Sequence, residues 1–178
     1  IYFKNFDEAE EICKQMDPKD LALDMRVLIG DWVRVIQLVD QGVGTDELVN
    51  VAYDNIANYY SEKFRWQKAA SHYSLAQNNE ALVKAYYQME DYENLSKMIE
   101  ILPEQSPLLQ ELGEKLESVG LCEEAVKAYV KAGNVRAAVD CCVVLNQWNL
   151  AIELAEEHNF VQIEGLLSRY ANMLLEEN

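Results

Sequence analysis

The sequence predicts an all-α protein, a right-handed α-solenoid of about twelve helices. One pattern occurs three times, at Phe6–Asp40, Trp66–Glu100 and Cys122–Glu156. Within each copy, apolar residues recur at separations of three, four and seven, which is the spacing of one face of an α-helix. Such self-similarity is typical of repeat proteins, in which each unit packs on its neighbours. We therefore expect helices packed on helices along the whole chain.

Aligning the three copies places large apolar residues opposite large ones and small residues opposite small ones. Representative columns are Phe6, Trp66 and Cys122; Ala9, Ala69 and Ala125; Cys13, Tyr73 and Tyr129; Ala22, Leu82 and Ala138; and Trp32, Tyr92 and Trp148. The three tryptophans fall in these columns, so we interpret them as packing residues at the turns between helices.

A shorter spacing of thirteen residues runs through each copy. It links Phe6, Lys19 and Trp32, then Trp66, Asn79 and Tyr92, and then Cys122, Val135 and Trp148. Thirteen residues suit a helix of about three turns followed by a tight turn. Each copy should therefore hold three short helices, and a longer helix should lead into the next copy.

Local signals set the helix boundaries of the first copy. The first helix, Phe6–Met16, ends where Asp17 and Pro18 suit a cap and a first helical turn. The second helix runs to Gly30, a natural C-terminal stop, and Asp31 opens the third. A long helix is predicted at Thr45–Lys63, with Thr45 as its cap.

Similar signals mark the rest of the chain. Pro103 follows the third helix of the middle copy, and Ser106 with Pro107 opens the next long helix. Gly120 and Gly133 are credible helix stops. The last helix is predicted at about Phe160–Glu176.

The long helices and the short helices that follow them resemble the tetratricopeptide (TPR) pattern. The matching residues are Tyr53, Ile56, Ala57 and Tyr60 before Ala69, Tyr73 and Ala76, and Leu109, Leu112, Gly113 and Leu116 before Ala125, Tyr129 and Ala132. The hairpins should thus be TPR-like, with Ala57 and Gly113 where two helices cross closely. The expected domain is one such solenoid over residues 1–178, a fragment truncated at both ends of a longer chain.

Charge narrows the range of partners. The net charge of −16 argues against binding nucleic acid or an anionic lipid surface, and no segment is apolar enough for direct membrane insertion. Within Gln88–Glu124 the only basic residues are Lys97 and Lys115. That stretch either attracts basic peptide segments or simply forms a solvated acidic face.

Catalytic and metal-binding patterns are missing from the sequence. It contains no glycine-rich phosphate loop, HExxH, CxxC or GxSxG motif, and its two histidines, His72 and His158, are far apart in the chain. The four cysteines have no metal-binding spacing and suggest buried packing in a reducing, intracellular compartment. We expect no enzyme activity, no cofactor and no metal.

A protein-binding surface is the remaining functional prediction. If a groove lies along the inner face of the long helices, its polar residues should bind a helix or an extended segment with basic side chains. The candidate residues are Asp54, Asn58, Glu62, Gln110, Glu111, Glu114 and Glu117.

Several short runs resemble the solenoid of the WD-repeat subunits of intraflagellar transport complex A. These runs are DPKDLALDMRVL at residues 17–28, GDWVRV at 30–35, AYY at 85–87 with DYE at 91–93, and AAVD at 137–140 with LNQW at 145–148. The resemblance implies a scaffold for retrograde transport and for the import of membrane proteins into cilia. Implied partners are the other complex A subunits, including a small, largely disordered one. Implied locations are the cytoplasm, the ciliary base and the axoneme.

Two other functions fit the same architecture. A coatomer-like vesicle-coat solenoid would share the fold and differ in its partners. A TPR cochaperone module would bind acidic peptide tails through lysines and arginines, for which this chain offers Lys63, Arg65 and Lys68 close together.

Overall fold

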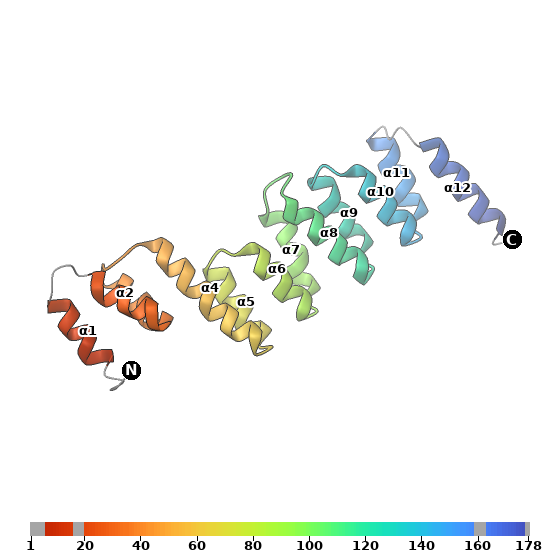
Figure 1. Cartoon of the computed structure of the whole chain (residues 1–178). Helices are drawn as coiled ribbons and strands as arrows, with labels where there is room; N and C mark the ends of the chain where they lie inside the picture. Colours follow the sequence, from red (N-terminus) through yellow and green to blue (C-terminus); the bar gives the residue numbers. More distant parts are fainter. Residues whose placement is uncertain (1–5, 16–19, 159–162, 177–178) are drawn as a thin grey trace. The chain divides into compact units, whose positions relative to one another are not determined.

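The structure, a computed structural model, describes residues 6–15, 20–158 and 163–176 (Figure 1). In these ranges it contains α-helices and the turns between them, and no β-strand. The chain forms two compact units, Ile1–Met89 and Glu90–Asn178. The first unit holds α1 (Phe6–Gln15), α2 (Asp20–Ile29), α3 (Trp32–Asp40), α4 (Asp46–Glu62), α5 (Trp66–Leu75) and α6 (Asn79–Gln88). The second holds α7 (Tyr92–Ile101), α8 (Pro107–Val119), α9 (Cys122–Lys131), α10 (Val135–Val144), α11 (Trp148–Glu157) and α12 (Ile163–Glu176). The predicted all-α class and number of helices are confirmed.

The thirteen-residue spacing marks where the short helices begin. In the middle copy, α5, α6 and α7 begin at Trp66, Asn79 and Tyr92, and in the last copy α9, α10 and α11 begin at Cys122, Val135 and Trp148. The first copy follows the spacing at Phe6 and Trp32, whereas Lys19, Met16, Asp17 and Pro18 lie outside the described residues. The predicted start of the last helix at Phe160 also lies outside them.

Side-chain caps and glycines explain some of the observed boundaries. The side chain of Asp31 accepts a hydrogen bond from the Arg34 amide and begins α3, and Gly120 ends α8 in the left-handed conformation. Thr45 occupies the predicted N-cap position of α4, but its side chain makes no capping hydrogen bond. The negative charges of Asp46 and Glu47 in the first turn instead stabilise the helix, because they lie at the positive end of its dipole.

Consecutive helices pack on one another within each unit, as expected for a solenoid of helical hairpins (Figure 1). The helix pairs α4–α5 and α8–α9 form the most extensive contacts. In the first unit, Leu23, Val35, Leu38 and Ala52 form a buried cluster that joins α2, α3 and α4. No helix in the described ranges is long and apolar enough to cross a membrane.

Gly113 lies where α8 crosses α9 closely, as the sequence predicts. A Cβ atom added to Gly113 would lie only 2.6 Å from Cε1 of the Tyr129 ring. The ring has little room to retreat, because Tyr129 is 2% exposed. Ala57, at the matching position of α4, is fully buried. A small residue is therefore required at this crossing.

Replacing Gly113 should test that requirement. We expect Gly113→Ala to lower the free energy of unfolding by about 1–3 kcal/mol through overpacking, although alanine is the better helix former by about 1 kcal/mol. Gly165 in α12 is the matched control, because no atom lies within 4 Å of its added Cβ. Urea denaturation should show Gly165→Ala at least as stable as the parent chain. An equally stable Gly113→Ala variant would contradict the close crossing.

Candidate protein-binding surfaces

The candidate residues on α4 are held in a network that joins three helices. The Tyr73 hydroxyl of α5 donates a 2.7 Å hydrogen bond to Asn58 Oδ1, and Asn58 Nδ2 donates to Asp54 at 3.1 Å. Asn78, the N-cap residue of α6, donates from Nδ2 to Asp54 Oδ1 at 2.6 Å. Glu62 is exposed. Asp54 and Asn58 therefore hold α4 against its neighbours, while Glu62 faces solvent.

The candidate residues on α8 form a similar network in the second unit. Asn134, the N-cap residue of α10, donates from Nδ2 to Gln110 Oε1 at 3.1 Å, and the Tyr129 hydroxyl donates to Glu117 Oε2 at 2.7 Å. Burial, and next the hydrogen bond to Glu117, raise the pKa of Tyr129. Gln110 Nε2 also donates to Glu114 at 3.2 Å. The polar side chains of α8 thus contact both α9 and α10.

The two networks have the same arrangement, which we call the polar clasp. It consists of an N-cap asparagine (Asn78 or Asn134), a tyrosine (Tyr73 or Tyr129) and the residues of the long helix that they contact. Each asparagine uses Oδ1 to accept a hydrogen bond from the backbone amide of the third residue of its own helix, at 3.1 Å, and Nδ2 to reach the long helix. Asparagine suits both tasks because its side chain carries both an acceptor and a donor. Among the described residues, each unit contains one polar clasp.

Of the seven candidate residues, Glu62 and Glu114 are the carboxylates that are exposed. Glu111 is partly exposed and forms an ion pair with Lys115 at 3.2 Å. The candidates on α4 and those on α8 belong to different compact units. The candidates on α4 and the candidates on α8 are therefore treated as two separate binding surfaces.

Asn78 should stabilise the first unit in two ways, as the N-cap of α6 and through its hydrogen bond to Asp54. We expect Asn78→Ala to lower the free energy of unfolding by about 1–2 kcal/mol, because it removes the N-cap and the bond to Asp54. Asn78→Ser should recover part of that loss, since serine restores only the cap. Thermal denaturation would measure both, with Asn79→Ala as the neighbouring control. Equal stability of the alanine and serine variants would show that the cap contributes nothing.

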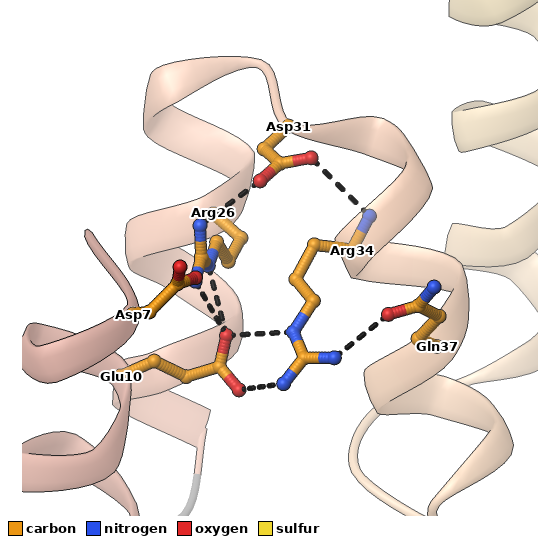
Figure 2. Close-up of polar contacts among 6 residues, drawn as sticks. All are labelled: Asp7, Glu10, Arg26, Asp31, Arg34 and Gln37. Carbon is orange, nitrogen blue, oxygen red and sulfur yellow. Dashed lines mark hydrogen bonds and ion pairs between the residues drawn. The ribbon is translucent and has the colours of Figure 1, made fainter. Parts of the chain in front are cut away.

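A cluster of charges around two buried residues joins α1, α2 and α3 (Figure 2). Glu10 is 1% exposed and Arg26 is 3% exposed. Arg26 Nε donates to Glu10 Oε2 at 2.9 Å, and Arg34 Nε donates to the same oxygen at 2.8 Å. Arg26 also pairs with Asp7 at 2.6 Å and with Asp31 at 2.9 Å. We call this set of residues the Glu10 cluster.

The Glu10 cluster was not predicted from the sequence. In the repeat alignment, Glu10 occupies the column of Ala70 and Val126, which are both buried. A carboxylate in an otherwise apolar column is the feature of the sequence that could have predicted the Glu10 cluster. Its charge is tolerated because two guanidinium groups satisfy both of its oxygens. Hydrogen bonding to Glu10 in turn raises the pKa of Arg34.

Removing the carboxylate should leave Arg26 buried without its main partner. We expect Glu10→Ala to lower the free energy of unfolding by about 3–5 kcal/mol, the usual effect of breaking a buried ion pair. Asp24→Ala, on the exposed side of α2, is the control. Guanidinium chloride is unsuitable because it screens charges, so unfolding should be measured in urea. A loss no larger than that of the control would contradict a structural role for the cluster.

The cysteines serve packing in the described structure. Cys122, Cys141 and Cys142 are buried, Cys13 is partly buried, and all four are free thiols. Cys122 and Cys142 have their sulfur atoms 3.8 Å apart across α9 and α10. Burial, followed by the neighbouring Cys122, raises the pKa of Cys141 to about 12. Among the described residues no group of three metal-binding side chains occurs.

Comparison with known proteins now identifies the type of repeat. The family described as "Region in Clathrin and VPS" matches residues 75–178. The chain belongs to this clathrin-region family. Within each unit, its successive helices pack on one another, and this fits the assignment.

Individual relatives match almost the whole length of this chain. It is 44% identical over 179 residues to WD repeat-containing protein 35 of Rattus norvegicus and to that of Homo sapiens, in each case covering 99% of this chain and 15% of the relative. It is 23% identical over 159 residues to an intraflagellar transport protein 172 homolog of Danio rerio, which covers 87% of this chain and 9% of that protein. The chain thus spans about 15% of the length of its more similar relatives.

Proposed function

We propose that this chain is part of a non-enzymatic scaffold of intraflagellar transport complex A, which supports retrograde transport and the import of membrane proteins into cilia. The observation that carries the proposal is the 44% identity to WD repeat-containing protein 35 over 99% of the chain. The weaker match to an intraflagellar transport protein points the same way. The sequence runs quoted above also resemble the WD-repeat subunits of complex A.

The finer assignment rests on the same resemblance. Among those subunits, we propose the one-hundred-and-twenty-one-kilodalton subunit as the one that this chain belongs to, on the resemblance of the quoted runs taken together. The proposed partners are the other complex A subunits, including the small, largely disordered one. The proposed locations are the cytoplasm, the ciliary base and the axoneme.

Binding would use the solvent-facing carboxylates of the long helices. Glu62 and Glu114 are exposed, and neither forms an ion pair within the described residues. Glu111 and Glu117 lie on α8 with Glu114 and add negative charge near it, although both already have partners. A basic segment from a partner would complement this charge and associate faster at low salt.

Reversing that charge should weaken binding. We expect Glu111→Lys, Glu114→Lys and Glu117→Lys together to lower the affinity for a basic partner segment at low salt. Glu114→Lys alone should give a clear part of the effect, because it disturbs neither Lys115 nor Tyr129. The control is the triple reversal of Glu104, Glu153 and Glu156, which are exposed elsewhere in the second unit. Unchanged affinity measured by calorimetry would remove the acidic surface from the account.

A vesicle-coat function is the second candidate, because the matching family is described as a region in clathrin and VPS. The architecture would be the same in that case. The partners would be vesicle-coat subunits, not complex A subunits.

One purification distinguishes the two functions. The intact protein that contains this chain would be purified from ciliated cells, and its partners identified by mass spectrometry. The comparison would be the same protein with this chain replaced by an unrelated solenoid of matched charge. Loss of complex A subunits on replacement is the expected result. Loss of vesicle-coat subunits would favour the second candidate, and unchanged partners would overturn both.

A further inference from the structure

The end of α4 and the start of α5 carry cations and aromatic rings that the proposed function does not use. We call this surface the aromatic–basic corner; it consists of Tyr59, Lys63, Phe64, Arg65 and Lys68. Lys63 Nζ lies 4.3 Å from the centre of the Tyr59 ring and donates a 2.7 Å hydrogen bond to the Tyr59 hydroxyl. Lys68 Nζ lies 5.5 Å from the centre of the Tyr60 ring. The two tyrosine rings contact each other edge to face, with centres 5.7 Å apart. The two ammonium groups therefore rest on neighbouring rings.

The cations of this corner lack acidic partners. In a chain of net charge −16, Lys63, Arg65 and Lys68 form no ion pair with any described residue. Arg26, Arg34 and Lys84, the other cations of the first unit whose side chains are described, each contact a carboxylate. The hydrogen bond from Lys63, followed by its charge, lowers the pKa of Tyr59. With Glu62 as the neighbouring exposed carboxylate, the three cations leave the corner with an excess of positive charge on an acidic chain.

A hollow of about 350 Å³ adjoins the corner. It is lined by the start of α3 and by one side of α4, with the residues Gly30, Asp31, Trp32, Val33, Asn55, Ile56, Tyr59 and Tyr60. Asp31 is the only carboxylate in that lining, and it already pairs with Arg26 at 2.9 Å. The hollow therefore offers apolar and aromatic surface next to cations that form no ion pair with a described residue.

Phe64 occupies a conformation that its side chain disfavours. Its φ angle is 56°, in the left-handed region, and its side chain is 80% exposed. In the repeat alignment, the matching position of the second unit holds Gly120, with a φ of 86°. Glycine has no steric cost in this region, whereas a bulky residue there is an outlier. Gln77 and Glu90, each with a φ of 57°, share this turn geometry. The exposure of the Phe64 ring between two cations is therefore what points to use as a contact surface.

We propose that the aromatic–basic corner and its hollow dock an acidic peptide segment of a partner protein. Carboxylates of the segment contact Lys63, Arg65 and Lys68, while one of its apolar side chains fills the hollow and another packs on Phe64. A short segment is favoured over a long polyanion, because the net charge of the chain repels nucleic acid and anionic membranes. The docking site goes beyond the proposed function, since it requires no particular complex.

The test is fluorescence anisotropy with a labelled peptide in which glutamate alternates with leucine, added to the whole chain. Comparison peptides carry lysine for glutamate or serine for leucine. We expect saturable binding of the glutamate–leucine peptide, weakening as salt increases, and weaker binding of the peptide with serine for leucine. Lys63→Glu with Lys68→Glu should reduce the affinity at least roughly tenfold. Arg136→Glu with Arg169→Glu, two exposed cations of the second unit, is the charge-matched control and should bind like the parent.

Phe64→Gly separates binding from folding. It should leave the melting temperature unchanged or raise it, because glycine relieves the left-handed strain, and yet reduce the affinity roughly fivefold. Circular dichroism would confirm that every variant is folded. The proposal is overturned if the double reversal binds the glutamate–leucine peptide no more weakly than its control does. It is also overturned if the double reversal weakens binding of the lysine–leucine peptide by the same factor. The proposal would also be overturned if the chain bound single-stranded DNA or phosphatidylserine vesicles but did not bind the glutamate–leucine peptide.

Discussion

In each compact unit, a tyrosine of a short helix meets a long helix where that helix offers a small residue and a polar acceptor. Tyr129 packs against Gly113 and donates its hydroxyl hydrogen to Glu117. Tyr73 donates to Asn58 in the other unit, where Ala57 is the buried small residue. The contact combines apolar burial with a satisfied hydroxyl group, which is what a buried tyrosine requires. Other features of the helix pair follow from this contact, because it fixes how closely the long and short helices approach.

The polar clasp extends the constraint to a third helix. An N-cap asparagine at the start of α6 or α10 reaches back to the long helix two elements earlier. The turn that precedes each of these helices is thereby tied to the helix pair. Residues that resemble a binding surface in the sequence therefore have a structural task as well. Glu62 and Glu114 remain directed to solvent, and this separates the part of the surface that is available to partners from the part that holds the fold.

Periodicity made most of the fold predictable from the sequence. Columns of large and small residues marked the helix starts at Trp66, Asn79 and Tyr92, and the small-residue column identified the crossing at Gly113. Contacts between residues distant in sequence were not predictable in the same way. No pattern in the nearby sequence predicts the hydrogen bond between Asn134 and Gln110. That Glu10 interrupts an apolar column becomes visible only when all three copies are compared. Of the candidate surface, helical spacing placed the residues on two long helices, but neither their exposure nor their hydrogen-bond partners followed from it.

Amide hydrogen exchange of the whole chain would test the central claim most directly, because amides in the most stable parts of a structure exchange most slowly. If the tyrosine contacts organise each unit, the slowest amides should lie in α4 and α5 of the first unit and in α8 and α9 of the second. Within those helices, the residues around Ala57 and Tyr73, and around Gly113 and Tyr129, should be protected longest. Slowest exchange in α2 and α3, or in α10 and α11, would contradict the account.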